Sequence, residues 1–376
     1  MQKRSAIVVA VACATGLASI VPATSHAQVS SNVQVYASGF NGPRGLKFGP
    51  DGLLYVAEAG TGGSTSTNGQ CTQVIPPVGP YTGGLTATIS KVSSAGKRVI
   101  VASGFPSAVS NMPPDFLGVA DLAFLNGKLY AALEGGGCSH GNPTIPNAIV
   151  EVDTATGNWK IVADLSAFVK AHPATYPNEA DFEPDGVPYS LIAYRDRLYT
   201  VESNHGQLFS ITAQGEVREE IDISEAEGHI VPTSIAERNG DFFVGNLGLF
   251  PATPNSSKIL TISRNSCPDP APGLDPSPEL QKLRVAGSRA GFTTIVAVSF
   301  GPDGLIYALE LSPAAGFPTL GVGKVVRLKG NGEIEDVATG LSVPTGMTFG
   351  PDGHLYVSNF GAASPGAGQI VRITIP

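Results

Sequence analysis

Oxygen-bearing side chains recur at one position in this chain of 376 residues, three residues after the aromatic residue of a short apolar segment. Glutamate or asparagine stands there at Glu58, Glu202, Asn246, Glu310 and Asn359. In a further segment Leu133 takes this position and Glu134 follows it, which a β-bulge would accommodate. Carboxylate and amide oxygens suit Ca²⁺, which takes about six to eight oxygen ligands. The alternative is that each side chain caps backbone groups where a strand leaves its sheet.

A second acidic group lies in the middle of the chain, and it could complete a ligand site. Its members are Glu179, Asp181, Glu183 and Asp185. Asp115 and Asp121 are similar candidates, and His140 and His205 follow comparable apolar segments. For the acidic group the alternative is a solvated loop, and for the histidines it is a structural hydrogen bond. The sequence therefore offers polar ligands without a recognisable zinc set.

The elements that must position these side chains are marked by the tetrapeptide Gly-Pro-Asp-Gly, which begins at Gly49, Gly301 and Gly350. Each copy follows an apolar run ending in Phe and precedes a second apolar run. Proline presets φ, Asp bonds its own backbone and the last Gly takes a positive φ, so each copy predicts a β-hairpin. A hairpin repeated along one chain is typical of a solenoid or propeller.

Weaker copies of the hairpin occupy residues 121–130, 191–199 and 234–243, which brings the count to six. A third strand follows each hairpin and a fourth leads into the next unit, so the sequence predicts an all-β, six-bladed propeller of four-stranded antiparallel blades. Residues 33–40 have the fourth-strand pattern. We expect them to pair with the last blade, which closes the ring and hides its sheet edges.

Two segments between the repeats have other predicted structures. Glu183-Pro184-Asp185-Gly186 resembles the hairpin turn, but prolines are poor in a ladder and Pro188 follows, so residues 183–189 are expected in the loop before blade three. Residues 164–171 begin with Asp164, a good N-cap, and predict two helical turns. This is the only good helix candidate after the leader.

The first 27 residues have a basic start, an apolar centre and small residues before Gln28, which predicts a signal peptide cut after Ala27. Residues 28–376 would then form one propeller domain, secreted or periplasmic, without a membrane span. The formal net charge of −8 disfavours nucleic acid as a partner. We expect a monomer that binds a small molecule or a protein. The sequence lacks a Gly-x-Ser-x-Gly elbow, a His-Glu-x-x-His pair and a phosphate-binding Gly-Lys-Ser/Thr loop.

Three cysteines follow the leader: Cys71, Cys138 and Cys267. Cys71 and Cys138 both lie between second and third strands of neighbouring blades, so they should emerge on one face, and export would allow a disulfide between them. The alternatives are free thiols or a bond from Cys138 to Cys267. Cys267 opens a proline-rich segment, residues 267–278, which reads as a stiff surface loop.

Residues 37–56 resemble the NHL-type repeat of six-bladed propellers through Ala37-Ser38-Gly39-Phe40, Gly45-Leu46 and Gly49-Pro50-Asp51-Gly52. Together with the leader, the Pro-Asp-Gly-Val-Pro-Tyr segment at 184–189 and the closing unit at 344–353, they resemble the ScyD/ScyE family. That family is exported and is named after gene clusters for the ultraviolet screen scytonemin. The resemblance implies the fold and export, and it carries no established reaction.

Two enzyme families of similar architecture lack an intact site here. Gluconolactonase-like propellers bind a divalent metal through a Glu-Gly pair, where this chain has Arg44-Gly45. Soluble quinoprotein sugar dehydrogenases have a Thr-Glu-Arg stretch; Glu58 matches its Glu, but Ala59 replaces its Arg. We therefore expect a binding or scaffold protein for an extracytoplasmic ligand or partner. The alternative is a Ca²⁺-dependent lactonase or hydrolase of the gluconolactonase-like class.

Overall fold

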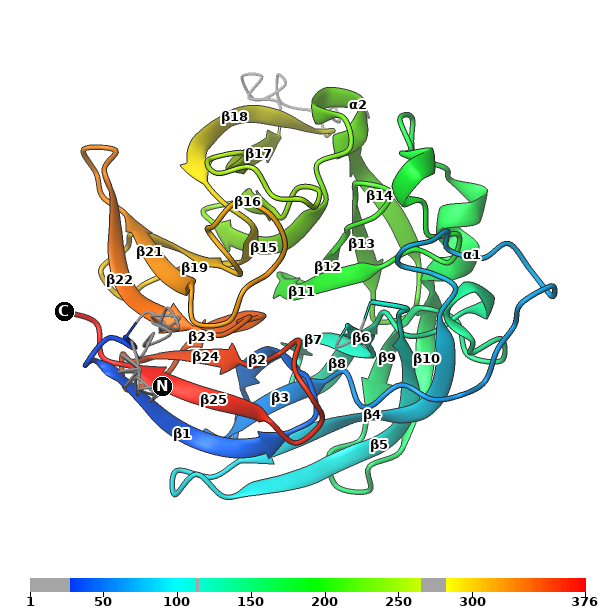
Figure 1. Cartoon of the computed structure of the whole chain (residues 1–376), viewed down its shortest axis with the longest axis horizontal. Helices are drawn as coiled ribbons and strands as arrows, with labels where there is room; N and C mark the ends of the chain where they lie inside the picture. The colour runs from blue at the N-terminus through cyan, green and yellow to red at the C-terminus, as the bar shows by residue number, and fades with distance from the viewer. Residues whose placement is uncertain (1–27, 113–114, 265–281) are drawn as a thin grey trace, which may run out of the picture.

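The computed structural model describes residues 28–112, 115–264 and 282–376, and in these ranges the strands form six antiparallel sheets arranged around a central axis (Figure 1). The predicted leader, residues 1–27, and the proline-rich segment with Cys267 lie outside the described residues. The six-bladed propeller predicted from the repeats is confirmed.

Each sheet is one blade. Blade one contains β2 (Pro43–Phe48), β3 (Leu54–Glu58), β4 (Thr82–Val92), β5 (Arg98–Val109) and the short β6 (Phe116–Leu117). Blade two contains β7 (Val119–Leu125), β8 (Lys128–Leu133), β9 (Ala148–Val152) and β10 (Trp159–Asp164). Blade three contains β11 (Pro188–Tyr194), β12 (Arg197–Glu202), β13 (Gln207–Thr212) and β14 (Val217–Asp222).

The second half of the ring repeats this order. Blade four contains β15 (Pro232–Arg238), β16 (Asp241–Asn246), β17 (Ser257–Arg264) and β18 (Leu283–Phe292). Blade five contains β19 (Ile295–Phe300), β20 (Ile306–Glu310), β21 (Gly323–Leu328) and β22 (Ile334–Leu341). Blade six contains β23 (Gly346–Phe349), β24 (Leu355–Asn359), β25 (Gly368–Ile373) and β1 (Val33–Phe40).

The amino-terminal strand closes the ring, as the sequence predicts. β1 pairs antiparallel with β25, with Gln34 opposite Arg372 and Val35 opposite Val371. The first strand of each blade lies innermost, and β2 contacts both β7 and β23 around the channel (Figure 1). Both ends of the described chain therefore lie in blade six.

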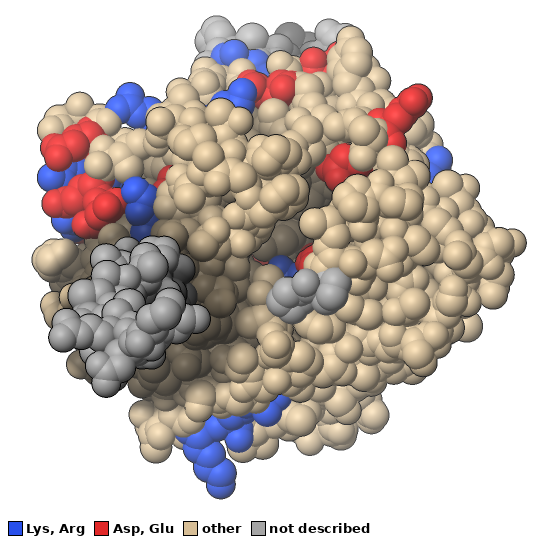
Figure 2. Space-filling model, in the orientation of Figure 1, with Lys and Arg blue, Asp and Glu red and all other residues tan. Residues whose placement is uncertain are grey.

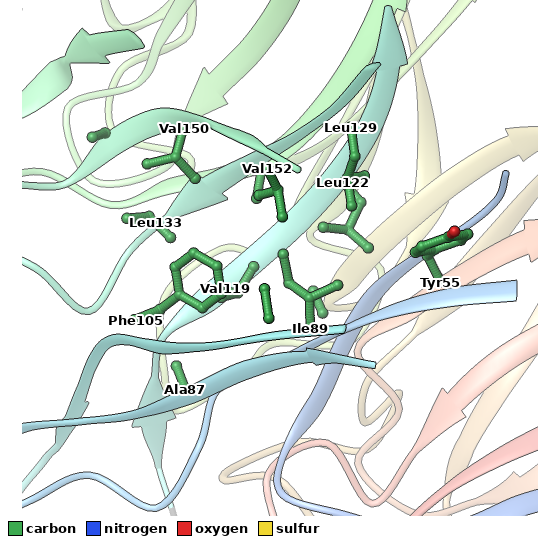
Figure 3. Close-up of a cluster of buried hydrophobic side chains, with 14 residues drawn as sticks. Tyr55, Ala87, Ile89, Phe105, Val119, Leu122, Leu129, Leu133, Val150 and Val152 are labelled. Atoms are coloured by element: carbon green, nitrogen blue, oxygen red, sulfur yellow. The ribbon is translucent and has the colours of Figure 1, made fainter. Parts of the chain in front are cut away.

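The core lies between neighbouring blades rather than inside one sheet. Figure 3 shows one cluster in which Ile89 and Phe105 of blade one pack against Leu129 and Val150 of blade two. All four side chains are at most 1 % exposed, and burying a side chain of this size stabilises the fold by roughly 1.5–3 kcal/mol. Each blade thus depends on its neighbours for a closed apolar interior.

In each Gly-Pro-Asp-Gly turn, the aspartate accepts a hydrogen bond from the tyrosine of the following strand. Asp51 accepts hydrogen bonds from the backbone N–H of Leu53 (3.2 Å) and from the hydroxyl of Tyr55 (2.9 Å). Tyr307 and Tyr356 donate to the turn aspartates of their own blades over the same distance. The aspartate therefore fixes both the turn and the start of the second strand.

Two local features depart from the expectations, and one agrees with them. Pro188 belongs to β11 rather than to the loop before it, because a proline is tolerated as the first residue of a strand. A second helix, α2 (Ile223–Glu227), follows β14, and the Asp222 side chain caps it. The predicted helix is present as α1 (Leu165–Ala171), capped by Asp164. Within the described parts of the chain, no helix has the length and apolar character needed to cross a bilayer.

Candidate functional site

Three long connections build up one face of blades one to three. They are residues 59–81 after β3, residues 134–147 after β8, and residues 165–187 between β10 and β11. A disulfide between Cys71 and Cys138, with the Cα atoms 6.4 Å apart, joins the first two connections. This is the pair expected from the sequence. Figure 2 shows the face in view hollowed near its centre, where small areas of basic and acidic atoms are visible.

Arg44 and Glu134 form the centre of the site. Arg44 lies on β2 and Glu134 directly follows β8, with Arg44 Nε 3.5 Å from Glu134 Oε1. The Arg44 guanidinium donates a hydrogen bond to the Phe116 carbonyl, and its central carbon lies 6.0 Å from the centre of the Tyr189 ring. Arg44 is 6 % exposed and Glu134 is fully buried. Among the residues that the structure describes, Arg44 Nε and both Glu134 carboxylate oxygens have no hydrogen-bond partner.

The surroundings of Glu134 favour its protonated form. Burial raises the pKa of Glu134 to about 7 from its ordinary 4.5; nearby Asp115 and Glu183 add to this effect, and Arg44 opposes it. Burial also raises the pKa of Asp115. A buried carboxyl that titrates near neutral pH can accept or donate a proton under ordinary conditions. Glu134 is therefore the group in the site best suited to acid–base chemistry.

A histidine–carboxylate pair lies beside this centre. His140 Nδ1 donates to the Gly136 carbonyl (2.6 Å), so Nε2 faces Glu183 Oε2 at 2.8 Å. The Tyr81 hydroxyl donates to Glu183 Oε1 at 3.4 Å. Burial alone would lower the pKa of His140, but the hydrogen bond and charge interaction with Glu183 outweigh it and raise this pKa. The pair ties the connection of blade two to the loop before blade three.

Asp185 and Asp181, two other members of the acidic group, have structural partners. Asp185 accepts hydrogen bonds from the Ser139 N–H and hydroxyl (2.7 Å each) and from Lys170 Nζ (2.5 Å). Burial opposes ionisation, but these bonds lower the pKa of Asp185 overall. Asp181 contacts His229 Nε2 at 2.9 Å, and Glu179 is exposed. Asp185, which the sequence suggested as a ligand, thus anchors α1 and the loop beside it.

Asp121 and His205 also have local roles. Asp121 accepts a hydrogen bond from the Leu191 N–H (2.8 Å), which links β7 to β11 at the channel wall. His205 Nε2 donates to the Glu183 carbonyl (3.1 Å), and its ring stacks on Phe182. Asp121 therefore fixes β11 against β7, and His205 holds the loop before blade three in place.

The repeated Glu and Asn residues are not brought together around the channel. Glu58 accepts from the Asn41 N–H (2.8 Å) and from Ser90, and Arg98 contacts it at 2.6 Å. The others accept backbone N–H groups in or beside their own blades: Glu202 from Val187 and His205, Asn246 from Lys258, Glu310 from Thr293, and Asn359 from Ser342. Backbone donors need partners where a strand ends, and these side chains supply them.

This arrangement favours the capping alternative over a ring of ligand oxygens. Four of the five side chains cap the segment that leads into their own blade, and Asn246 accepts from β17 while it donates to the Ile230 carbonyl. Within residues 28–112, 115–264 and 282–376, no group of three or more His, Cys, Asp or Glu side chains is arranged to hold a metal ion. The five side chains are therefore committed to hydrogen bonds at the ends of their own blades.

Sequence reasoning missed part of the site, namely Arg44, Tyr81 and Tyr189. Arg44 stood out only as a replacement for a metal-binding Glu, and Tyr189 only as part of the Pro-Asp-Gly-Val-Pro-Tyr segment. Tyr189 is half-buried and lines the channel. Arg44, the neighbour of Tyr189 across the site, lies 145 positions earlier in the chain, so spacing alone could not pair the two residues.

Comparisons with known proteins agree on the fold. No family model matches the chain, and no curated protein matches its sequence. Many solved structures are similar, among them the following three. A gluconolactonase from Xanthomonas campestris has TM-score 0.54 and 10 % identity, covering 92 % of this chain and 89 % of that one. The PQQ-bound aldose sugar dehydrogenase from Streptomyces coelicolor has TM-score 0.53 and 13 % identity, covering 93 % and 99 %. A Bacteroides thetaiotaomicron protein of unknown function has TM-score 0.56 and 12 % identity, covering 93 % and 77 %.

Proposed function

We propose that this protein is an exported propeller of ScyD/ScyE type that binds a small extracytoplasmic ligand on the loop face of blades one to three. The ligand site is the loop-face cluster: Arg44, Tyr81, Asp115, Glu134, His140, Glu183 and Tyr189. One observation supports it above the others. Glu134 is fully buried beside Arg44, and within the described chain neither of its oxygens has a hydrogen-bond partner.

The cost of such a carboxyl is the reason to expect a ligand. A buried polar group without a partner costs roughly 1–3 kcal/mol, so natural proteins retain few of them. The carboxyls that end second strands have partners: Glu58, Glu202 and Glu310 all accept backbone N–H groups. Glu310 Oε2 lacks a hydrogen bond but has Lys324 Nζ 3.6 Å away. Glu134 is thus available to a bound molecule, whether that is a ligand or an ordered water.

Export and partner remain proposals that rest on the sequence. The predicted leader, residues 1–27, supports secretion or a periplasmic location. Arg44 and Ala59, which replace residues of the two enzyme sites, support a binding role. We expect the mature protein to act as a monomer, because ring closure by β1 leaves β25 paired on both sides.

A hydrolase is the second candidate, and the neutral-range pKa of Glu134 favours it. A similar structure bears the name gluconolactonase, but the described residues do not supply a metal site. In a metal-free reaction, Glu134 would take a proton from water as the water oxygen attacks the lactone carbonyl carbon. The ring C–O bond would then break, and the leaving oxygen would receive that proton.

A ligand panel with a matched variant tests the proposed function. The panel contains neutral polyols, phenols, lactones, carboxylates and amines, and binding is measured by ligand-observed NMR and by the melting temperature of the mature chain. Glu134→Gln resembles the protonated carboxyl, so it should fold. Glu333→Gln, at an exposed side chain, is the control.

The proposal predicts that at least one compound of the panel binds the parent protein and Glu333→Gln but does not bind Glu134→Gln. If every compound binds Glu134→Gln as well as the parent, the loop-face cluster is not the ligand site. Turnover of a panel lactone that is lost in Glu134→Gln would support the hydrolase instead.

A further inference from the structure

We infer that the ligand presents a vicinal diol to Arg44 and Glu134. Each hydroxyl donates a hydrogen bond to one Glu134 oxygen, and one hydroxyl oxygen accepts a hydrogen bond from Arg44 Nε. This inference rests on the proposed function and names the chemical class of its ligand. It follows from the hydrogen-bonding capacity that the described residues leave unused at this place.

The unused capacity has a definite pattern. Ionised Glu134 offers two acceptor oxygens and Arg44 Nε offers one donor, 3.5 Å from Oε1. The other end of the guanidinium donates to the Phe116 carbonyl, so it is held in place. A complementary ligand group must supply two donors and at least one acceptor close together. Two adjacent hydroxyls do this, because each hydroxyl donates once and also accepts.

The charges around the pair exclude most other ligand groups. An ammonium ion would approach the Arg44 guanidinium, which lies 3.5 Å from Glu134 Oε1, and would be repelled by it. A carboxylate or phosphate would be repelled by Glu134 and by Asp115, which interacts with Glu134 electrostatically. A primary amide carries both of its N–H donors on one nitrogen. It therefore reaches the two Glu134 oxygens less well than two separate hydroxyls do. An uncharged pair of hydroxyls meets no like charge.

Tyr189 supplies the remaining feature of such a site. Its ring is half-buried at the channel and lies 6.0 Å from the Arg44 guanidinium carbon. An aromatic ring beside a few oriented polar groups offers a surface for the carbon skeleton that carries the hydroxyls. The ring thus favours a cyclic diol over a flexible chain, which would lose more conformational freedom on binding.

Protonation of Glu134 should weaken this contact. The protonated carboxyl has a hydroxyl of its own, so one of the two acceptor positions becomes a donor. The titratable and charged groups facing Glu134 are Arg44 from β2, Tyr189 from β11, and, from the connections, Tyr81, Asp115, His140 and Glu183. With the Glu134 pKa near 7, the ionised fraction, and with it the affinity, should fall roughly tenfold between pH 8 and pH 6.

Isomeric diols provide the probes. The mature protein is titrated with cis-1,2-cyclohexanediol and catechol, and their 1,3-isomers, cis-1,3-cyclohexanediol and resorcinol, serve as controls. Acetate and ethylamine are the charged probes. Affinities come from saturation-transfer NMR and calorimetry, on the parent protein, Glu134→Gln, Arg44→Lys and Glu333→Gln, and circular dichroism checks that each variant is folded.

We expect the 1,2-isomers to bind the parent protein and Glu333→Gln at least tenfold more tightly than the 1,3-isomers. This preference should disappear in Glu134→Gln and in Arg44→Lys, whose single ammonium cannot reproduce Nε. Equal binding of the isomers, or a preference retained in Glu134→Gln, would overturn the diol inference.

The remaining outcomes separate the two proposals. Binding of a charged probe or a 1,3-isomer that depends on Glu134 would keep the site and refute its diol chemistry. If no probe binds in a manner that depends on Glu134, ordered water is the occupant of the pair. The diol inference and the loop-face ligand site would then both be wrong.

Discussion

At the scale of single residues, Glu134 differs from the carboxyls that end second strands because it comes one position later, directly after its strand. Leu133 takes the position that Glu58 and Glu202 occupy in their blades, and it is fully buried. Successive strand residues point to opposite sides, so a shift by one residue sends the side chain the other way. Glu134 therefore turns to Arg44, while the neighbouring blades use their glutamates as caps.

The shift of the Glu134 pKa makes a prediction about stability. Because the folded protein binds this proton more tightly than the unfolded chain, the free energy of unfolding should decrease as pH rises from about 4.5 to about 7. Glu134→Gln removes this loss, since its side chain does not titrate. Relative to that of the parent protein, the free energy of unfolding of the variant should rise by on the order of 3 kcal/mol across this pH range.

Urea unfolding of both proteins at several pH values measures this difference. Glu333→Gln corrects for general effects of removing one acidic side chain. A difference between Glu134→Gln and the parent that stays constant from pH 4.5 to 7 would mean that the Glu134 pKa is not raised.

Glu58 should behave as a structural residue. It is fully buried, and Arg98 approaches both of its oxygens, at 2.6 Å and 2.9 Å. Glu58→Gln removes the charge that this guanidinium faces, so it should lower the free energy of unfolding by about 2–3 kcal/mol. Urea unfolding at neutral pH measures the loss, and ligand binding at the loop-face cluster should be unchanged. An unchanged stability together with lost binding would restore Glu58 to the candidate site.

At the scale of elements, the hairpins were predictable because their turns depend on adjacent residues alone. Gly52, Gly304 and Gly353 each have a positive φ, as the repeat predicts. The loops could not be predicted in the same way. The segment from residue 172 to 187 is fixed by His140, Asn204 and His229, which come from other connections. Contacts of this kind leave no local pattern in the sequence.

The two glycines Gly353 and Gly287 allow a controlled test of the turn. A Cβ at either position would meet no atom within 4 Å, but only Gly353 has a positive φ, of 77°. Gly353→Ala should therefore lower the free energy of unfolding by about 1–2 kcal/mol through backbone strain alone. Gly287→Ala should be neutral or slightly stabilising. Equal effects of the two substitutions in thermal or urea unfolding would contradict this explanation of the repeat.

At the scale of the whole molecule, the site exists because the ring is closed. Arg44 lies in blade one, Glu134 in blade two and Tyr189 in blade three, so only radial packing places them together. The fold, the count of blades and the closure by residues 33–40 followed from the repeats. The composition of the site did not, because the sequence indicated which side chains follow strands but not which way each one turns.

Ring closure can be tested by an engineered crosslink. Gln34 and Arg372 lie opposite each other in β1 and β25, and their side chains contact at 3.2 Å. Directly paired antiparallel residues have Cα atoms about 4.5–5.5 Å apart, which suits a disulfide. Gln34→Cys with Arg372→Cys should therefore form an intramolecular bond under mild oxidation, detected by non-reducing peptide mapping.

Gln369 pairs with Ser38 instead, so Gln34→Cys with Gln369→Cys is the control and should remain reduced. Absence of the first crosslink, or equal formation of both, would show that β1 does not pair with β25 in this register.

The most direct test of the central claim is a pH titration of Glu134 itself. The protein is labelled with ¹³C at the glutamate carboxyl carbons, and the Glu134 resonance is identified as the one missing from Glu134→Gln. A buried carboxyl beside Arg44, with no protein hydrogen-bond partner in the described chain, should titrate with a midpoint near 7. A midpoint below about 5, as for an ordinary solvated or capped glutamate, would contradict the proposed site.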